Sequence, residues 1–119
     1  MITEELLQFL WKYKLYASQV LKTTQGEPIE VVHPGIHNTD SGPDFFNAKI
    51  KIGETLWAGN VELHVKSSDW FLHQHHTNKA YNNVILHVVI DSDREACSEN
   101  GRLLPVLVLK VQESLLSRY

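Results

Sequence analysis

Cysteine is almost absent from this sequence, because Cys97 is the only one among 119 residues. An internal disulfide and a zinc site made of several cysteines are therefore excluded. Long hydrophobic runs are also missing, since no apolar stretch approaches the roughly 20 residues that a membrane-spanning helix needs. Residues 1–14 carry acidic side chains where a secretory signal carries basic ones. We therefore expect a cytoplasmic protein with no membrane partner.

An excess of positive charge is absent as well. The chain has 11 Lys and Arg against 14 Asp and Glu, which gives a formal net charge of -3. This balance argues against a general nucleic-acid coat protein, although it leaves room for a local basic patch. With 43% hydrophobic residues, the chain can bury about two-thirds of its unfolded surface in one domain over residues 1–119. Histidine, by contrast, is abundant, with seven residues.

The first residues predict an amphipathic helix over residues 3–18. Thr3 is suited to the N-cap, and Glu4 and Glu5 are acids at the positive end of the helix dipole. Apolar side chains then recur with the 3.6-residue period of a helix that covers a sheet: Leu6, Leu7, Leu10 and Trp11.

Strand patterns fill most of the remaining chain. The expected strands span residues 29–33, 44–52, 55–66, 84–90 and 103–109, and the last two are apolar enough to predict central positions. A loop over 37–43, an irregular link over 67–83 with a short helix near 79–81, and a closing helix over 111–119 complete the chain. This order predicts an α/β fold with a mixed central sheet and flanking helices.

The segment 55–66 places chemically active side chains on one face of a strand. Alternate side chains of an extended strand share a face, so Glu62, His64 and Lys66 point one way. Val61 and Leu63 point the other way and suit the core. An acid, an imidazole and an ammonium group are therefore expected in a row.

The register of the hairpin decides whether Asp44 joins this row. A strict two-residue turn at Gly53-Glu54 places Asp44 opposite Leu63, on the wrong face. One extra residue in the second strand would place Asp44 opposite His64, with Glu62 diagonal to it. We predict a bulge at Gly59, or an equivalent one-residue irregularity.

Two carboxylates that converge at the start of a strand form a site for a hard cation. Asp44 and Glu62 are expected to bind Mg²⁺ or Mn²⁺, which would polarise a phosphodiester and lower the pKa of a bound water. His64 or Lys66 would orient that water. In the alternative, Asp44 caps a turn and Glu62 pairs with Lys66 on a solvated face of the sheet.

Pro43-Asp44 at the head of one strand and Glu62 in the next resemble the PD-(D/E)XK nuclease superfamily. The resemblance implies a restriction-endonuclease-like fold and a metal-dependent phosphodiesterase or nuclease, or a degenerate relative. The sequence departs from the pattern because His64 stands where the lysine belongs, and Lys66 follows two residues later.

A closer resemblance covers residues 26–70 and 81–89. Both segments look like the N-terminal region of an uncharacterised bacterial family that is classed as a domain of unknown function. Members of that family are several times longer. The resemblance therefore implies that this chain is an N-terminal piece of such an architecture or a short relative.

The remaining histidines keep two other functions open. His73 and His75, with His76 beside them, could bind Zn²⁺ together with Asp69 or Glu62. His87 lies in an apolar run and is either a buried imidazole satisfied by hydrogen bonds or a partner that orients Glu62 or His64.

A non-catalytic domain that binds nucleic acid or another protein is a further alternative to the nuclease. An isolated domain of this size often needs a second copy to grip a duplex. A homo-oligomer or an association with further domains is therefore compatible with this sequence.

Overall fold

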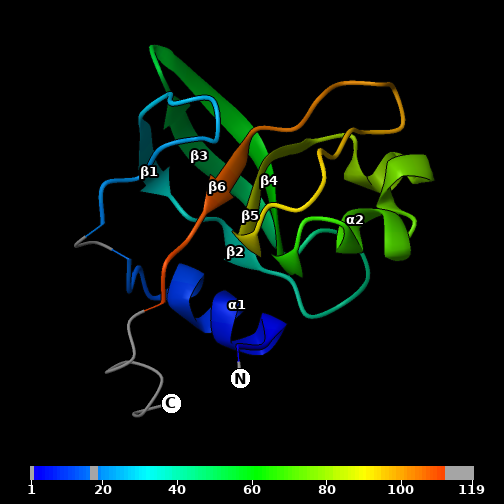
Figure 1. Cartoon of the computed structure of the whole chain (residues 1–119), viewed down its shortest axis with the longest axis horizontal. Helices are drawn as coiled ribbons and strands as arrows, with labels where there is room; N and C mark the ends of the chain where they lie inside the picture. The colour runs from blue at the N-terminus through cyan, green and yellow to red at the C-terminus, as the bar shows by residue number, and fades with distance from the viewer. Residues whose placement is uncertain (1, 17–18, 112–119) are drawn as a thin grey trace.

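The computed structural model describes residues 2–16 and 19–111 and contains an open, mixed sheet of six strands with few helices (Figure 1). The helices are α1 (Glu4–Lys12) and α2 (Asp69–Leu72), with the 3-10 helices η1 (His75–Thr77) and η2 (Lys79–Tyr81). The strands are β1 (Ile29–His33), β2 (Ile36–His37), β3 (Phe45–Ile52), β4 (Thr55–Lys66), β5 (Val84–Asp91) and β6 (Val106–Val108). The predicted mixed α/β sheet is therefore confirmed.

The sheet has the strand order β1-β3-β4-β5-β6, and the short β2 also pairs with β3. The pairs β1–β3, β2–β3 and β3–β4 are antiparallel, whereas β4–β5 and β5–β6 are parallel. The prediction that both final strands are central is wrong for β6, which forms an edge. Its apolar character has another cause: Leu107 is buried, and Thr24 N donates to Val106 O, so the segment around Thr24 covers the open edge.

Helix α1 begins as the sequence predicts, because the Thr3 side chain accepts a hydrogen bond from Leu6 N. It ends six residues earlier than expected. Lys14 adopts a φ of 55°, and its backbone N–H donates to Trp11 O, while Leu15 N donates to Leu10 O. This pair of bonds is a Schellman motif, in which lysine takes the left-handed position that glycine usually occupies. The predicted closing helix over 111–119 falls almost wholly outside the described residues.

The two faces of the sheet are buried in different ways. The apolar stripe of α1 packs on one face against Phe45, Val61 and Leu63, among others. The opposite face of β4 and β5 is covered by α2 and η2, where Trp70 and Tyr81 form a smaller apolar cluster. Glu62 and His64 alternate with Val61 and Leu63 along β4, so they point into this second, narrower layer.

The hairpin contains the one-residue irregularity that the sequence predicts, but the extra residue lies in β3 rather than in β4. Ala48 pairs with Gly59, whereas Phe45 pairs with Val61, and Asn47 between them has a φ of 59°. Gly59 serves a different purpose, because a Cβ there would lie 2.5 Å from Ile85 Cγ2. Extended by one residue beyond the pair Phe45–Val61, this register places Asp44 opposite Glu62. The expected pairing of Asp44 with His64 is therefore wrong.

Candidate metal centre

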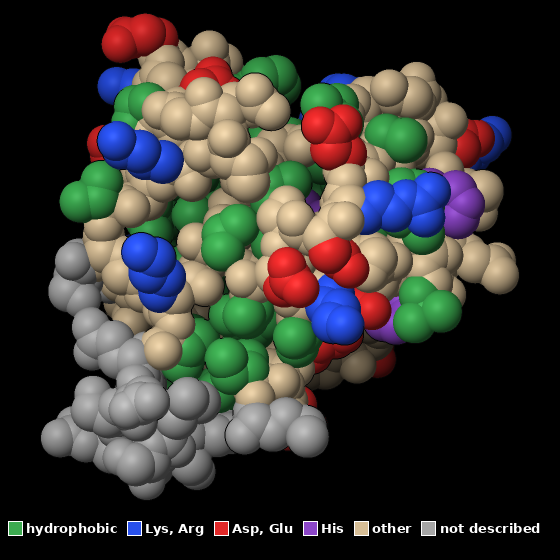
Figure 2. All heavy atoms as spheres, viewed as in Figure 1, with side chains coloured by type: hydrophobic (Ala, Val, Ile, Leu, Met, Phe, Trp, Pro, Cys, Tyr) green, Lys and Arg blue, Asp and Glu red, His purple; other side chains and the backbone are tan. Residues whose placement is uncertain are grey.

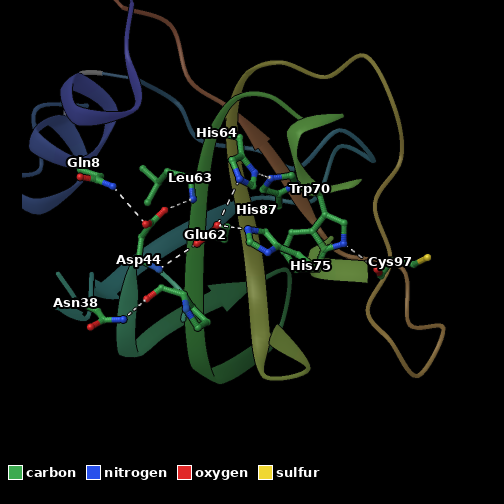
Figure 3. Close-up of polar contacts among 11 residues, drawn as sticks. Gln8, Asn38, Asp44, Glu62, Leu63, His64, Trp70, His75, His87 and Cys97 are labelled. Atoms are coloured by element: carbon green, nitrogen blue, oxygen red, sulfur yellow. Dashed lines mark hydrogen bonds and ion pairs between the residues drawn. The ribbon is translucent and has the colours of Figure 1, made fainter. Parts of the chain in front are cut away.

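Asp44 and Glu62 meet at the point where β3 begins beside β4 (Figure 3). Asp44 N donates to Glu62 Oε1 over 3.0 Å, and Leu63 N donates to Asp44 Oδ2 over 2.9 Å. Gln8 of α1 donates its side-chain amide to Asp44 Oδ1 over 3.2 Å. These bonds turn the Asp44 carboxylate towards α1 and leave Glu62 Oε2 directed at the histidines of the opposite face.

The two acids lie close together, with Glu62 buried and Asp44 half-buried. Glu62 is 4% exposed, and its pKa is raised to about 10, first by burial and then by the negative charge of Asp44. Burial also raises the pKa of Asp44, although the hydrogen bond from Leu63 N opposes this change. Within residues 2–16 and 19–111, no lysine or arginine forms an ion pair with either acid. Asp44 therefore disfavours the ionisation of Glu62, and either a proton or a cation at this place would relieve the repulsion between the two acids.

Two imidazoles contact the same oxygen of Glu62. His75 Nε2 lies 2.9 Å from Glu62 Oε2, and His64 Nε2 lies 3.3 Å from it. Burial, together with the neighbouring imidazoles, lowers the pKa of His64 to about 2 and that of His75 to about 4. Both rings are therefore neutral at physiological pH, which is the form that binds metal ions.

His64, His73 and His75 bring one ligand nitrogen each to a common place, with all three nitrogens within 4.8 Å of one another. His64 comes from β4, His73 follows the end of α2, and His75 begins η1. His76 lies apart from this group, because its ring packs against Phe71 at 5.0 Å. The cluster thus contains two of the three histidines expected for zinc, with His64 in place of the third.

Aromatic rings support the imidazoles from behind. Tyr81 stacks on His75 with ring centroids 3.7 Å apart, and Trp70 meets His75 edge-on at 5.2 Å. The indole N–H of Trp70 is held by the carbonyl oxygen of Cys97. His87 is fully buried, and its Nε2 lies 2.8 Å from His64 Nδ1, where it fixes the orientation of the His64 ring.

Lys66 lies away from the acids. It is exposed at the end of β4, and in the described part of the chain its ammonium group forms no ion pair with Asp44 or Glu62. Glu62 is buried, so the alternative of a surface Glu62–Lys66 pair does not describe this site. Of the two candidates for orienting water, only His64 touches Glu62.

Sequence reasoning missed two residues of α1. Gln8 binds Asp44 directly, and the half-buried Glu4 interacts electrostatically with His73 and Asp44. Burial raises the pKa of Glu4. Their separation of four residues places both on one flank of the helix, next to the apolar stripe. That polar flank is the signal that could have indicated a helix facing a site.

An open cleft of about 570 Å³ leads to Asp44 from the solvent. It runs between α1 and the loop before β3, and its lining includes Gln8, Lys12, Asn38 and Asp44. Asn38 closes this loop by donating its side-chain amide to Ser41 O and Pro43 O. The cleft therefore exposes Asp44 on the α1 side, whereas Glu62 and the histidines beside it are not part of its lining.

The chain belongs to a family of proteins of unknown function (DUF2851), which it matches over residues 4–119. No curated protein matches the chain, and no solved structure matches it. Membership of an uncharacterised family is thus confirmed, whereas the nuclease-like core stays a prediction. Among the described residues, no helix has the length and apolar character needed to cross a membrane.

Proposed function

We propose that this member of the DUF2851 family is a metal-dependent phosphodiesterase or nuclease of the PD-(D/E)XK type, or a degenerate relative of one. Asp44 and Glu62 would hold Mg²⁺ or Mn²⁺. The observation that carries the proposal is the closeness of the buried Glu62 to the half-buried Asp44, with no lysine or arginine paired to either within the described residues. Such a pair is costly to bury unless a cation joins it.

The ligand chemistry fits a hard divalent cation. Carboxylate oxygens are the ligands that Mg²⁺ and Mn²⁺ prefer. Burial and then the negative charge of Asp44 raise the pKa of Glu62, and a cation between the two acids would offset their repulsion. When bound, the ion would polarise a phosphodiester and activate a water molecule. The chain itself keeps Asp44 in position through Leu63 N and Gln8, so the acid is preorganised rather than mobile.

The order of elements supports a restriction-endonuclease-like architecture. Helix α1 precedes the antiparallel strands β1, β3 and β4, a helical link follows, and β5 then returns parallel to β4. Asp44 immediately precedes β3, and Glu62 lies within β4, as the nuclease pattern requires. His64 occupies the lysine position of the pattern and contacts Glu62, which makes it the nitrogen donor next to the acids.

The surface favours a localised site over a broad nucleic-acid coat. Positive and negative side chains are interspersed on the face shown in Figure 2. A coat protein would instead present a continuous basic stripe to the phosphate backbone. A non-catalytic interaction domain remains the rival outcome of the experiment below.

Cleavage assays with single-stranded, duplex and structured DNA and RNA in Mg²⁺ or Mn²⁺ test the proposal. We expect the wild type to cut at least one substrate and Asp44→Asn or Glu62→Gln to reduce the rate by about 100-fold or more. Asp40→Asn is the matched control, because Asp40 is an exposed acid that lines the same cleft, and its activity should be unchanged.

Thermal unfolding separates metal binding from turnover. Mn²⁺ should raise the Tm of the wild type and of Asp40→Asn but not that of Asp44→Asn. Absence of cleavage of every substrate by the wild type would overturn the hydrolase proposal. If nucleic acid still bound equally well to Glu62→Gln, the interaction domain would replace it.

A further inference from the structure

The histidine side of Glu62 has the composition of a second metal site. The ligand nitrogens of His64, His73 and His75 converge within 4.8 Å, and His64 and His75 are 0% and 7% exposed. His64 comes from β4, whereas His73 and His75 come from the link that follows it, so the convergence of the three rings depends on how this link folds back onto the strand.

Among the described residues four histidines have a buried ring nitrogen without a hydrogen-bond partner, namely His64, His75, His76 and His87, and the first two belong to the cluster. His64 Nδ1 is engaged by His87, but His64 Nε2 has no hydrogen-bond partner, and its 3.3 Å approach to Glu62 Oε2 is not aligned for one. His75 Nε2 reaches Glu62, whereas His75 Nδ1 is also unpartnered. Buried ring nitrogens are normally satisfied, and an ion ligated by them satisfies them.

The ligand set selects the class of ion. Neutral imidazoles with one carboxylate suit Zn²⁺ and similar transition-metal ions, whereas Mg²⁺ prefers an all-oxygen shell. Tetrahedral Zn²⁺ with bonds of about 2.0 Å needs nitrogens about 3.3 Å apart, so the cluster must contract. His73 is exposed at the end of α2 and can supply this movement by a change of side-chain rotamer.

The geometry points to a zinc-type site formed by His64, His73 and His75, with Glu62 as the fourth ligand. Glu62 would then lie between this ion and the Asp44 side, which it already touches through Asp44 N. The contacts of His87 with His64 and of Tyr81 with His75 would hold two of the three imidazoles in place. This site goes beyond the proposed Mg²⁺ or Mn²⁺ site, because its ligands are three imidazoles and Glu62, without Asp44.

Titration of the untagged protein with Co²⁺, followed by its visible absorption, tests the site directly. Four-coordinate Co²⁺ absorbs intensely in the visible, and Zn²⁺ added afterwards should displace it and bleach the band. We expect one equivalent to bind to the wild type. His73→Ala should lose at least about 100-fold in affinity, because it removes one ligand from an exposed position that the fold does not need.

Three further variants identify the ligands. His76→Ala is the matched control from the same segment and should bind as the wild type. His73→Cys should retain binding and add a thiolate-to-cobalt charge-transfer band, which a purely structural role of His73 would not produce. Asp44→Asn should also retain Co²⁺, even though it loses the proposed Mn²⁺ site.

Three results would overturn the inference. The first is that the wild type takes up no Co²⁺ or Zn²⁺, and the second is that His73→Ala binds Co²⁺ as tightly as the wild type. The third result is that Asp44→Asn loses the cobalt spectrum, because this loss would place the ion at the pair of acids instead. If the wild type cleaves no nucleic acid but the cobalt titrations give the expected results, the proposed function is contradicted and the zinc-type site is not.

Discussion

Glu62 is the residue at which the two sides of the centre meet. Asp44 approaches Oε1 through its backbone N–H, while His64 and His75 approach Oε2 with neutral nitrogens. Because burial and Asp44 raise the pKa of Glu62 to about 10, this carboxyl holds a proton at neutral pH when no cation is bound. Metal binding must displace that proton.

The variant Glu62→Gln should therefore stabilise the metal-free protein. Glutamine has the same shape and can still accept the hydrogen bond from Asp44 N, but it does not resist burial as a carboxylate does. We expect the free energy of unfolding at pH 8 in EDTA to rise by on the order of 1–3 kcal/mol, measured by urea denaturation. Asp40→Asn should leave it unchanged, and a destabilised Glu62→Gln would contradict the charge assignment.

The sequence singles out Asp44 and Glu62 as neighbours, but it does not determine the register in which they meet. Alternation along β4 correctly groups Glu62 with His64 on one face. The residue opposite Asp44 depends on which strand carries the extra residue. The sequence does not indicate whether the bulge lies at Asn47 or at Gly59. His73 and His75 reach His64 only because the link after β4 folds back, which no local pattern encodes.

At the scale of elements, the bulge in β3 sets the geometry of the acids. Asn47 occupies the left-handed region with an exposed side chain, while its N–H donates to Asn60 Oδ1. Asparagine tolerates this conformation better than most residues, and a β-branched residue tolerates it poorly. Without this residue, Asp44 would fall opposite Leu63 and face away from Glu62.

Substitution at Asn47 tests this role of the bulge. Asn47→Gly should be as stable as the wild type or more stable, because glycine adopts a positive φ without strain. Asn47→Val should lower the free energy of unfolding by about 1–2 kcal/mol and weaken Mn²⁺ binding as the register is strained. Chemical denaturation and metal titration measure both effects, and equal stability of the two variants would refute the argument.

The boundaries of the elements follow from the sequence where side chains make local signals. The Thr3 cap of α1 and the turn between β3 and β4 are such signals, and both are found as expected. Lys14 carries no such signal, since lysine rarely ends a helix in the left-handed region. Helix α2 has only four residues and follows no detectable period.

At the scale of the whole molecule, buried titratable groups give the stability two opposing dependences on pH. The pKa values of His64, His75 and His87 fall from 6.5 to about 2, 4 and 3, chiefly by burial. Their contribution is complete above pH 6.5 and is lost progressively as the pH falls from 6.5 towards 2. Glu62 acts in the opposite sense, because its pKa rises from 4.5 to about 10. Its contribution is present below pH 4.5 and is lost as the pH rises towards 10.

These dependences predict a stability maximum for the metal-free protein. Between pH 4.5 and 6.5 three imidazoles outweigh one carboxyl, so Tm in EDTA should increase with pH. Above pH 6.5 the Glu62 carboxyl dominates, and Tm should decline slowly up to pH 9. Glu62→Gln should abolish this alkaline decline while it keeps the acidic one, and saturating Mn²⁺ should reverse it in the wild type. A wild-type Tm that rises steadily to pH 9 in EDTA would show that Glu62 is already ionised in the folded protein and that its charge is balanced by the surrounding imidazoles.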